Sequence, residues 1–272
     1  MVAGRAEIEF ADDGGRTRLA HLDQSDPLRI LFPEVDPREP VTGALVTTSG
    51  GLVGGDTLGI SVTGAKNTAS RIVGQAAEKV YRSTGADVTI EVRLDASDGA
   101  WLEWLPQETI LFDNARMRRT TVAEVGAGAR LLAGEMIVFG RTAMGESMTR
   151  GLVRDVWEVR RAGRLVWSDA LHLDENLEDA LQTAAGFDGA LAYASLIYVG
   201  DDAEEQLSAA RELLGGAASD VLTSATCVGD VLILRWVGAK SLTLRNDYGA
   251  FWGGFRNRIA GYPATMPRLW NM

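Results

Sequence analysis

The chain has 272 residues, a formal net charge of −10 at pH 7 and 46% hydrophobic residues. This length suits one large β or α/β domain or two smaller ones, and the composition excludes a disordered chain. The acidic balance argues against a general nucleic-acid-binding protein, which normally carries a basic face. One cysteine, Cys227, excludes an internal disulfide and suits a reducing compartment. No apolar run approaches the about 20 residues that span a membrane, so we expect a cytoplasmic protein.

Alternating polarity predicts many short strands in the first 200 residues. Residues 5–10 and 16–22 are expected to form a hairpin around the turn 12–15. Four prolines between 27 and 40 exclude a helix or a central strand in that stretch. Further strand candidates are 41–48, 57–63, 75–83, 88–95, 101–105, 110–112, 120–125, 130–139, 152–160, 164–171 and 193–199. The short intervals between them predict mainly antiparallel pairing.

Two segments near the C-terminus have helical periodicity. Asp202 and Glu205 resemble a capping box in front of an apolar face that ends at Gly215. A second helix is predicted over 246–260, where aromatic and aliphatic residues recur at spacings of four, three and four.

Between the two helices, 221–226 and 231–237 are expected to form a strand pair. No internal repeat is evident in the sequence. We therefore expect a single domain, 1–272, with a β body over about 1–200 and an α+β part over about 201–272.

A glycine-rich stretch lies between two of the predicted strands. Gly50, Gly51, Gly54 and Gly55 are followed by Asp56, and glycine permits backbone conformations and close approaches that other residues do not. The stretch lacks the Gly-Lys-Ser/Thr ending of a P-loop and the spacing of a dinucleotide fingerprint. Its N–H groups could still cradle an anion. An enzyme or binding protein that holds a small phosphorylated or carboxylated ligand at Gly50–Asp56 is therefore one alternative.

Catalytic constellations are missing from the sequence. The two histidines, His21 and His172, have neither the spacing nor the cysteine neighbours of a zinc site, and no G-x-S-x-G elbow is present. We predict no stable metal site and no catalytic residues. A carbohydrate-binding β module is a further alternative, which seven tryptophans favour and the acidic chain does not.

Five motifs in one order resemble the family of the urease accessory protein UreD. They are Gly50–Asp56, Gln75–Ser83, Leu102–Ile110, Gly140–Glu146 and the ending Met266–Trp270. The motif residues that carry the resemblance are Gly50, Gly51, Gly54, Gly55, Gln75, Lys79, Tyr81, Pro106, Gln107 and Arg141.

The resemblance implies a non-enzymatic role in urease maturation. Members of this family work with the partner proteins UreF and the GTPase UreG on the urease apoprotein, and they are thought to pass nickel through an internal polar passage. No nucleic-acid or membrane partner is implied. The implied fold is mostly β, with elongated, β-helix-like stacking of strands and two α-helices towards the C-terminus.

On this interpretation, carboxylates in apolar surroundings line a route for transient nickel(II), without a tightly bound cofactor. Oxygen donors suit transit, because imidazole and thiolate ligands would hold nickel more tightly. The candidates are Asp56, Glu108, Glu135, Glu146 and Glu158. The same carboxylates are equally compatible with internal ion pairs, since burying an unpaired charge is costly. Arg82, Arg116 and Arg141 are the arginines considered for such pairs.

A partner surface is expected in the C-terminal part. Tryptophan and arginine are enriched at binding hot spots. We expect Trp252, Arg256, Arg258 and Trp270 to be exposed and to help form a surface that faces UreF.

Overall fold

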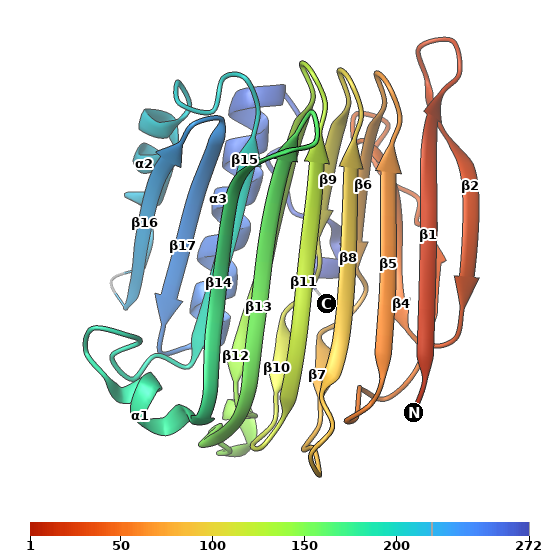
Figure 1. The fold of residues 1–272 in the computed structure, drawn as a ribbon. Coiled ribbons are helices and arrows are strands. Elements are labelled where there is room, and N and C mark those ends of the chain that lie inside the picture. The colour runs from red at the N-terminus through yellow and green to blue at the C-terminus, as the bar shows by residue number, and fades with distance from the viewer. Residues whose placement is uncertain (219, 272) are drawn as a thin grey trace.

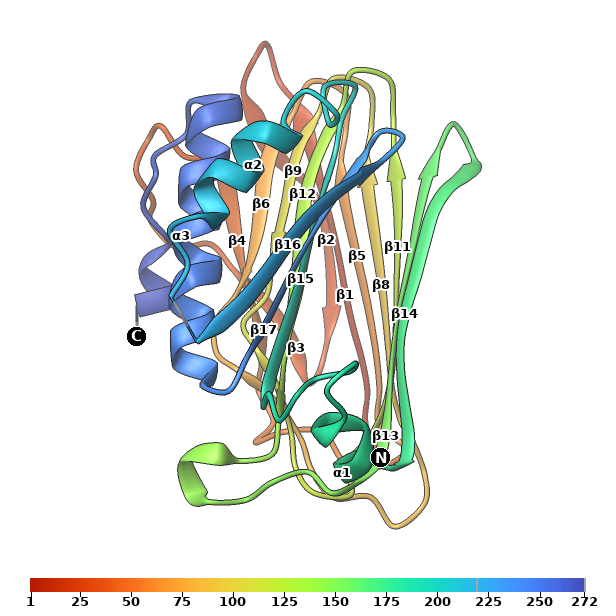
Figure 2. The same ribbon diagram turned by 90° about the vertical axis from the view of Figure 1, so that its left-hand side faces the viewer.

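Two β-sheets pack face to face, and helices cover one outer face of the pair (Figures 1 and 2). The computed structural model describes residues 1–218 and 220–271. Along most strands every second side chain is buried, as in β8, whose Val88, Ile90, Val92 and Leu94 all lie in the core. This alternation supplies each sheet with an apolar inner face.

The front sheet in Figure 1 has seven strands. In spatial order they are β14 (Arg164–Asn176), β13 (Arg150–Arg161), β11 (Arg116–Val125), β8 (Val88–Ala96), β5 (Thr57–Gly64), β1 (Ala3–Asp12) and β2 (Thr17–Ser25).

The second sheet has ten strands. Its main path is β16 (Val221–Val228), β17 (Val231–Gly238), β15 (Ala192–Val199), β12 (Arg130–Phe139), β9 (Trp101–Leu105), β6 (Ala69–Gly74), β4 (Val41–Thr47) and β3 (Leu28–Leu31). The short strands β10 (Thr109–Leu111) and β7 (Glu78–Val80) extend it beside β12.

The chain winds through the two sheets as a solenoid. It passes from β4 to β5, from β6 to β8, from β9 to β11 and from β12 to β13, changing sheet each time. Each coil stacks on the one before it through parallel pairs in both sheets. The mainly β, stacked architecture is therefore confirmed.

The expectation that the sheets are rich in antiparallel pairs is wrong for the body of the protein. In the described residues, antiparallel pairs between named strands occur only at its ends, in β1–β2, β3–β4, β13–β14 and the series β12–β15–β17–β16, and the body adds a single isolated antiparallel bridge, Arg82–Ala115. Alternating polarity is the same in parallel and antiparallel strands, so it does not reveal strand direction. The short turns that suggested hairpins carry the chain to the opposite sheet instead.

Two helices towards the C-terminus are confirmed. α2 (Leu207–Leu214) and α3 (Ser241–Ala260) pack on the outer face of the ten-stranded sheet (Figure 2). A short helix that the sequence analysis missed, α1 (Leu177–Gln182), follows β14, and 3-10 turns lie at η1 (Thr142–Met144) and η2 (Arg268–Asn271). None of the helices in the described part of the chain is long and apolar enough to cross a membrane.

The capping-box prediction is wrong. α2 begins only at Leu207, beyond the predicted capping pair. The Asp202 carboxylate accepts hydrogen bonds from the Tyr198 hydroxyl at 2.6 Å and from Gln206 Nε2 at 3.0 Å, so it holds the turn before the helix.

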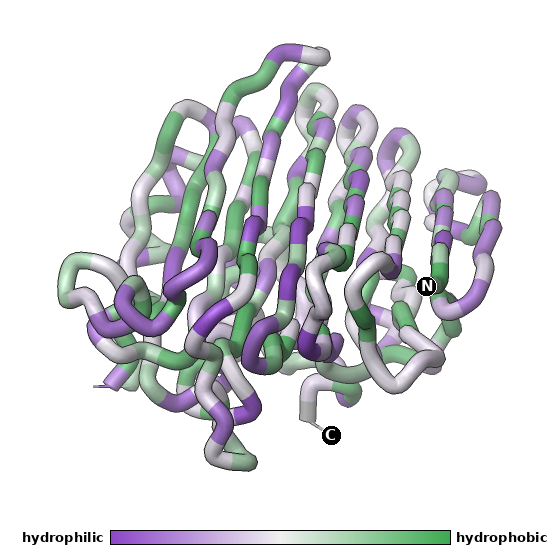
Figure 3. The backbone as a smooth tube through the Cα atoms, turned by 60° about the horizontal axis from the view of Figure 1, so that its bottom comes forward, coloured by the Kyte–Doolittle hydropathy of each residue, from purple (hydrophilic) through white to green (hydrophobic). Residues whose placement is uncertain are grey.

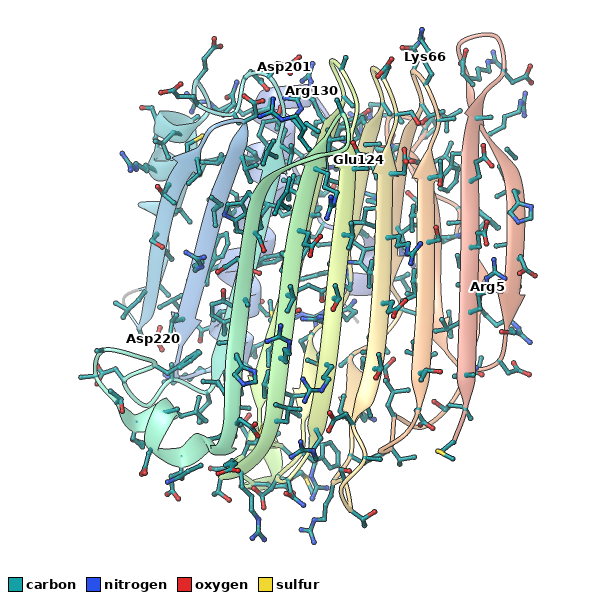
Figure 4. All side chains as sticks on the ribbon, in the orientation of Figure 1. Arg5, Lys66, Glu124, Arg130, Asp201 and Asp220 are labelled. Atoms are coloured by element: carbon teal, nitrogen blue, oxygen red, sulfur yellow. The ribbon has the colours of Figure 1, made fainter. Side chains whose placement is uncertain are left out.

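Two apolar layers hold the fold together. One lies between the sheets, and the other lies between the ten-stranded sheet and helices α2 and α3. The turns at the upper end of the sandwich carry exposed charged side chains such as Lys66 and Asp201 (Figure 4). The lower end, which Figure 3 turns towards the viewer, has longer turns.

Candidate functional site

The internal motifs occupy equivalent turns of the four coils, at the lower end of the sandwich in Figure 1. The turn from β4 to β5 contains 50–56, and the next three contain 75–83, 106–109 and 140–146. Parallel pairing of β7 with β10 and of β10 with β12 joins successive turns, and Leu52 bridges to Val80. Segments that lie far apart in sequence are thereby brought together.

The glycine loop fits tightly against the neighbouring turn. Gly51 has φ +145°, and a Cβ there would lie 2.6 Å from the Tyr81 ring and 2.8 Å from the Lys79 carbonyl oxygen. A Cβ on Gly54 would lie 2.5 Å from the Ala86 carbonyl oxygen. The Tyr81 hydroxyl donates a hydrogen bond to the Gly50 carbonyl at 2.7 Å. The glycines therefore serve close packing between coils.

We expect Gly51→Ala to lower the free energy of unfolding by about 2–4 kcal/mol, because it combines an unfavourable φ with backbone overlap. Gly50→Ala should stay within about 1 kcal/mol of the wild type, since the nearest atom to its added Cβ, the Tyr81 hydroxyl, is 3.8 Å away. Urea denaturation of both variants measures the difference. Equal losses would show that the loop is not held by close packing at Gly51.

Asp56 closes the loop rather than facing a cavity. Its carboxylate is 3% exposed and accepts hydrogen bonds from the backbone N–H groups of Val2 at 2.7 Å and Val53 at 2.9 Å. Asp56 therefore acts on the shape of the loop, and the structure does not place it with the other candidate carboxylates.

The N–H groups of the loop are also largely engaged. Leu52 N–H donates to the Lys79 carbonyl, Gly55 N–H to the Asp87 carbonyl and Asp56 N–H to the Val53 carbonyl. These donors are not free for an anion, so the geometry weighs against an anion cradle at Gly50–Asp56.

A cavity of about 200 Å³ opens beside this loop and extends between the sheets. Its walls come from the first three motif turns and from the inner faces of both sheets. Seven residues singled out in the sequence line it, namely Gly50, Gly51, Gln75, Lys79, Pro106, Gln107 and Glu135. The stacking of coils thus gathers most of the motif residues around one space.

A buried ionic cluster forms the deep end of the cavity. Arg119 donates to both carboxylate oxygens of Asp155, at 2.9 and 2.7 Å, and to Glu135 at 2.6 Å. Trp104 Nε1 donates to the other Glu135 oxygen at 3.0 Å. All three charged side chains are nearly inaccessible. Burial raises the pKa of Glu135 to about 7, with Arg119 opposing the rise and Asp155 adding to it.

Oxygen donors also line the wall nearer the glycine loop. Glu78 Oε2 accepts a hydrogen bond from the Thr47 hydroxyl at 2.5 Å, and burial raises the pKa of Glu78. Gln107 Nε2 donates to the Leu269 carbonyl at 2.9 Å and to the Gly74 carbonyl at 3.3 Å. The buried Gln107 Oε1 has no hydrogen-bond partner among the described residues.

Three charged residues of this site were missed in the sequence. Glu78 lies inside a recognised motif but was not singled out there. Arg119 and Asp155 stand at inward positions of β11 and β13, between buried residues such as Met117 and Trp157. Side chains two residues apart on a strand point to the same face of the sheet. A charged residue at a position that alternation assigns to the buried face was therefore the signal that could have identified Arg119 and Asp155.

The other candidate carboxylates lie outside this cavity. Glu108 pairs with Arg245. Glu146 pairs with Arg141 and accepts the Asp113 N–H at 2.9 Å, and the Arg141 guanidinium lowers the pKa of Glu146.

A second cavity, of about 250 Å³, is lined by Lys79, Glu108 and Arg141. Glu158 lies far from both cavities, on the outer face of the seven-stranded sheet, where it pairs with Arg160 at 2.8 Å. The structure therefore separates the five carboxylates that the sequence analysis grouped.

The expected exposure of the C-terminal candidates is wrong for three of the four. Trp252, Arg256 and Trp270 are buried in the layer between α3 and the ten-stranded sheet. Arg258 alone is exposed, and it pairs with Glu212 of α2 at 2.8 Å. Trp252 and Arg256 lie on the face of α3 that carries the apolar stripe, and Trp270 lies in the turn η2. Tryptophan and arginine occur both at binding surfaces and in buried positions, so residue type did not predict their burial.

Within residues 1–218 and 220–271, no three His, Cys, Asp or Glu side chains cluster closely enough to hold a metal ion. The side chains that offer a cation oxygen atoms in the cavity are Thr47, Ser49, Glu78, Gln107, Thr109 and Glu135, beside the positive charges of Lys79 and Arg119. Such a set suits weak and exchangeable contacts with a divalent ion.

Comparisons with known proteins agree with the motifs. Residues 2–271 match the family model described as UreD urease accessory protein. The chain is 47% identical to a urease accessory protein UreD of Magnetococcus marinus, over all of this chain and 94% of that protein. It is 37% identical to a urease accessory protein UreD of Azorhizobium caulinodans over 98% of this chain and 95% of that protein. It is 38% identical to a urease accessory protein UreD 2 of Methylorubrum populi over 94% and 84%, respectively.

Proposed function

This chain belongs to the UreD family of urease accessory proteins, which are assembly factors rather than enzymes and act in urease maturation, and we propose that it helps to convey Ni²⁺ through the cavity between its sheets. Its partners in this role would be the urease apoprotein, UreF and the GTPase UreG. Nickel is the cargo, held transiently on the way to the urease.

The observation that carries the proposal is the buried cluster at the deep end of the cavity. Asp155 binds Arg119 through two hydrogen bonds, whereas Glu135 receives only one from the same guanidinium. Glu135 is therefore the more exchangeable partner. Two carboxylates face one guanidinium, so the cluster carries a net charge of −1 when both are ionised, which favours a passing cation.

The donor set supports transit rather than storage. Oxygen atoms of Glu78, Thr47 and Gln107 line the same cavity as Glu135, and none of the residues known to line it is His or Cys. A passage works only if the ion leaves as readily as it enters, and hard oxygen donors bind nickel more weakly than imidazole or thiolate.

A surface for UreF is proposed on the exposed sides of α2 and α3. Arg258 and Glu212 lie on that surface as a solvent-exposed pair. The buried residues Trp252, Arg256 and Trp270 support the surface from beneath by fixing α3 on the sheet.

The test replaces the two cavity carboxylates together, as Glu78→Gln with Glu135→Gln. The variant is co-expressed with the urease subunits, UreF and UreG, and the nickel content of the purified urease is measured by elemental analysis. We expect a several-fold loss of nickel, because the uncharged amides cannot stabilise the cation. Co-purification of the partners should be unchanged.

Glu158→Gln is the matched control, because Glu158 lies on the outer sheet face and outside the cavity. Its urease should contain normal nickel. Normal nickel in the cavity variant, with all partners retained, would refute conduction through this cavity.

A further inference from the structure

The last of the five motifs lies outside the four turns, in the segment that follows α3. We call this segment, 261–270, the strap. It runs back along α3 (Figure 2): the Asn257 side chain near the end of the helix donates to the Tyr262 carbonyl at 2.7 Å, and Arg245 near the start of the helix donates to the Trp270 carbonyl at 2.8 Å. Apart from the turn η2 the strap contains no helix or strand, so side chains rather than a backbone ladder bind these carbonyl groups.

A glycine of α3 allows the strap to lie against the helix. A Cβ on Gly253 would be 2.0 Å from the Ala264 carbonyl oxygen, so any other residue at this position has to displace the strap. A Cβ on Gly249, one turn earlier, would be 3.4 Å from the Met266 side chain, which is an ordinary contact distance. Glycine is unfavourable inside a helix, and close seating of the strap accounts for Gly253.

The strap closes on the third motif turn. Gln107 Nε2 donates to the Leu269 carbonyl of the strap at 2.9 Å and to the Gly74 carbonyl at the longer distance of 3.3 Å. Arg245 binds Glu108 of the same turn as well as the strap. The segment that lies on α3 is therefore joined directly to a residue that lines the cavity.

The bond to the strap fixes the orientation of the Gln107 amide. Only Nε2 can donate, and a flipped amide would place Oε1 against two carbonyl oxygens. Oε1 is therefore left as an acceptor, buried and without a hydrogen-bond partner in the part of the chain that the structure describes. Gln107 is 4% exposed, and an unpartnered acceptor that is buried at a cavity wall calls for a donor or a cation.

We propose that the strap is a positioning element of the cavity, which holds Gln107 so that the amide oxygen, and not the amide nitrogen, is presented to Ni²⁺. The inference rests on the proposed function. It gives the last motif and Gly253 a part in nickel delivery, although neither is among the described residues that line the two cavities. Without the strap the amide keeps only its longer bond, to Gly74, and is free to rotate.

The seating of the strap is tested first, on the full chain without partners. Arg268 is exposed, but trypsin cuts after it only when the strap leaves its place, because a protease needs several residues in an open conformation. We expect cleavage after Arg268, followed by mass spectrometry, to be at least about tenfold faster in Gly253→Ala than in Gly249→Ala. Equal rates would show that the strap is not seated through Gly253 and would overturn the proposal.

Nickel delivery is tested next, with the urease subunits, UreF and UreG co-expressed. We expect several-fold less nickel in urease from Gly253→Ala and from Gln107→Leu than in urease from Gly249→Ala. Gly253→Ala combined with Gln107→Glu should restore the nickel content, because both ends of a carboxylate accept and its orientation no longer matters. A lack of restoration would mean that the strap acts through stability or partner docking and not through Gln107.

Gln107→Glu alone keeps the test decisive if Gly253→Ala does not fold. Its carboxylate cannot donate to the Leu269 carbonyl, so cleavage after Arg268 should become faster while nickel stays normal. Low nickel in this variant would overturn the positioning role. Normal nickel with Gly253→Ala, together with a loss in the Glu78/Glu135 variant, would refute the role of the strap and leave the proposed function standing. Normal nickel in both would refute both.

Discussion

Arg256→Met is expected to lower the free energy of unfolding by about 3–5 kcal/mol, because removing one partner of a buried ionic network leaves charges uncompensated. Arg256 is 1% exposed and donates to Glu103 at 3.0 Å, to Glu39 at 2.6 Å and to the Pro263 carbonyl at 2.9 Å. Its loss would leave Arg71 as the one cation that the structure places beside both carboxylates. Chemical denaturation followed by tryptophan fluorescence measures the change.

The neighbouring Arg258→Met provides the control. Arg258 is on the same helix, but its pair with Glu212 is exposed, with side-chain accessibilities of 48% and 71%. Exposed pairs contribute at most about 1 kcal/mol. Similar losses in the two variants would mean that the buried network does not anchor α3. A normal Arg256→Met protein that fails to bind UreF would restore the interpretation of this residue as an interface contact.

Arg119→Met is expected to be equally destabilising, by about 3–5 kcal/mol at neutral pH, because two buried carboxylates lose their shared cation. Glu135 and Asp155 are each 3% exposed. A second variant keeps the experiment decisive if the first does not fold. Replacing the whole cluster, as Arg119→Met with Glu135→Met and Asp155→Leu, should recover most of the stability, since an apolar set of similar volume needs no compensation.

The pH dependence of the stability lost in Arg119→Met identifies the cause of that loss. Burial holds the pKa of Glu135 at about 7 in the folded protein, against an ordinary value of 4.5. A raised folded-state pKa contributes stability that is present below about pH 4.5 and is lost as the pH rises through about 7. Without Arg119 that pKa rises further, so the deficit of Arg119→Met should be small near pH 5 and grow towards pH 8. A deficit that is constant with pH would point to lost packing instead of uncompensated charge.

The triple variant, Arg119→Met with Glu135→Met and Asp155→Leu, also separates an effect on folding from an effect on nickel delivery. It should be stable and bind its partners, yet urease matured with it should contain little nickel, because Glu135 is absent from the cavity. Normal nickel in that urease would mean that the cluster is purely structural, which is the ion-pair interpretation that the sequence left open.

The candidate carboxylates show what can and cannot be predicted from local sequence patterns. Glu135 was identified because it interrupts an apolar strand, and the structure places it in the cavity. Asp56, Glu146 and Glu158 were selected by the same reasoning, but they hold a loop, a turn and a surface pair, respectively. Burial of a carboxylate can be inferred from its neighbours in sequence, whereas its partner lies on another strand. Arg119 illustrates this, since it is 16 residues from Glu135 in sequence and on the opposite sheet.

The strands, the two C-terminal helices, the glycine loop and the family could all be predicted from the sequence. These features depend on periodicity, on glycine's backbone freedom and on motifs, all of which are local properties. The parallel stacking of the coils, the gathering of the first three motif turns around one cavity and the burial of Arg256 became visible only in the fold. Strand direction and ion-pair partners depend on contacts between distant segments. The alternation of polar and apolar residues along a strand is the same whether the neighbouring strand is parallel or antiparallel. For this reason the residues around the cavity were recognisable as motifs, but their common site became visible only in the fold.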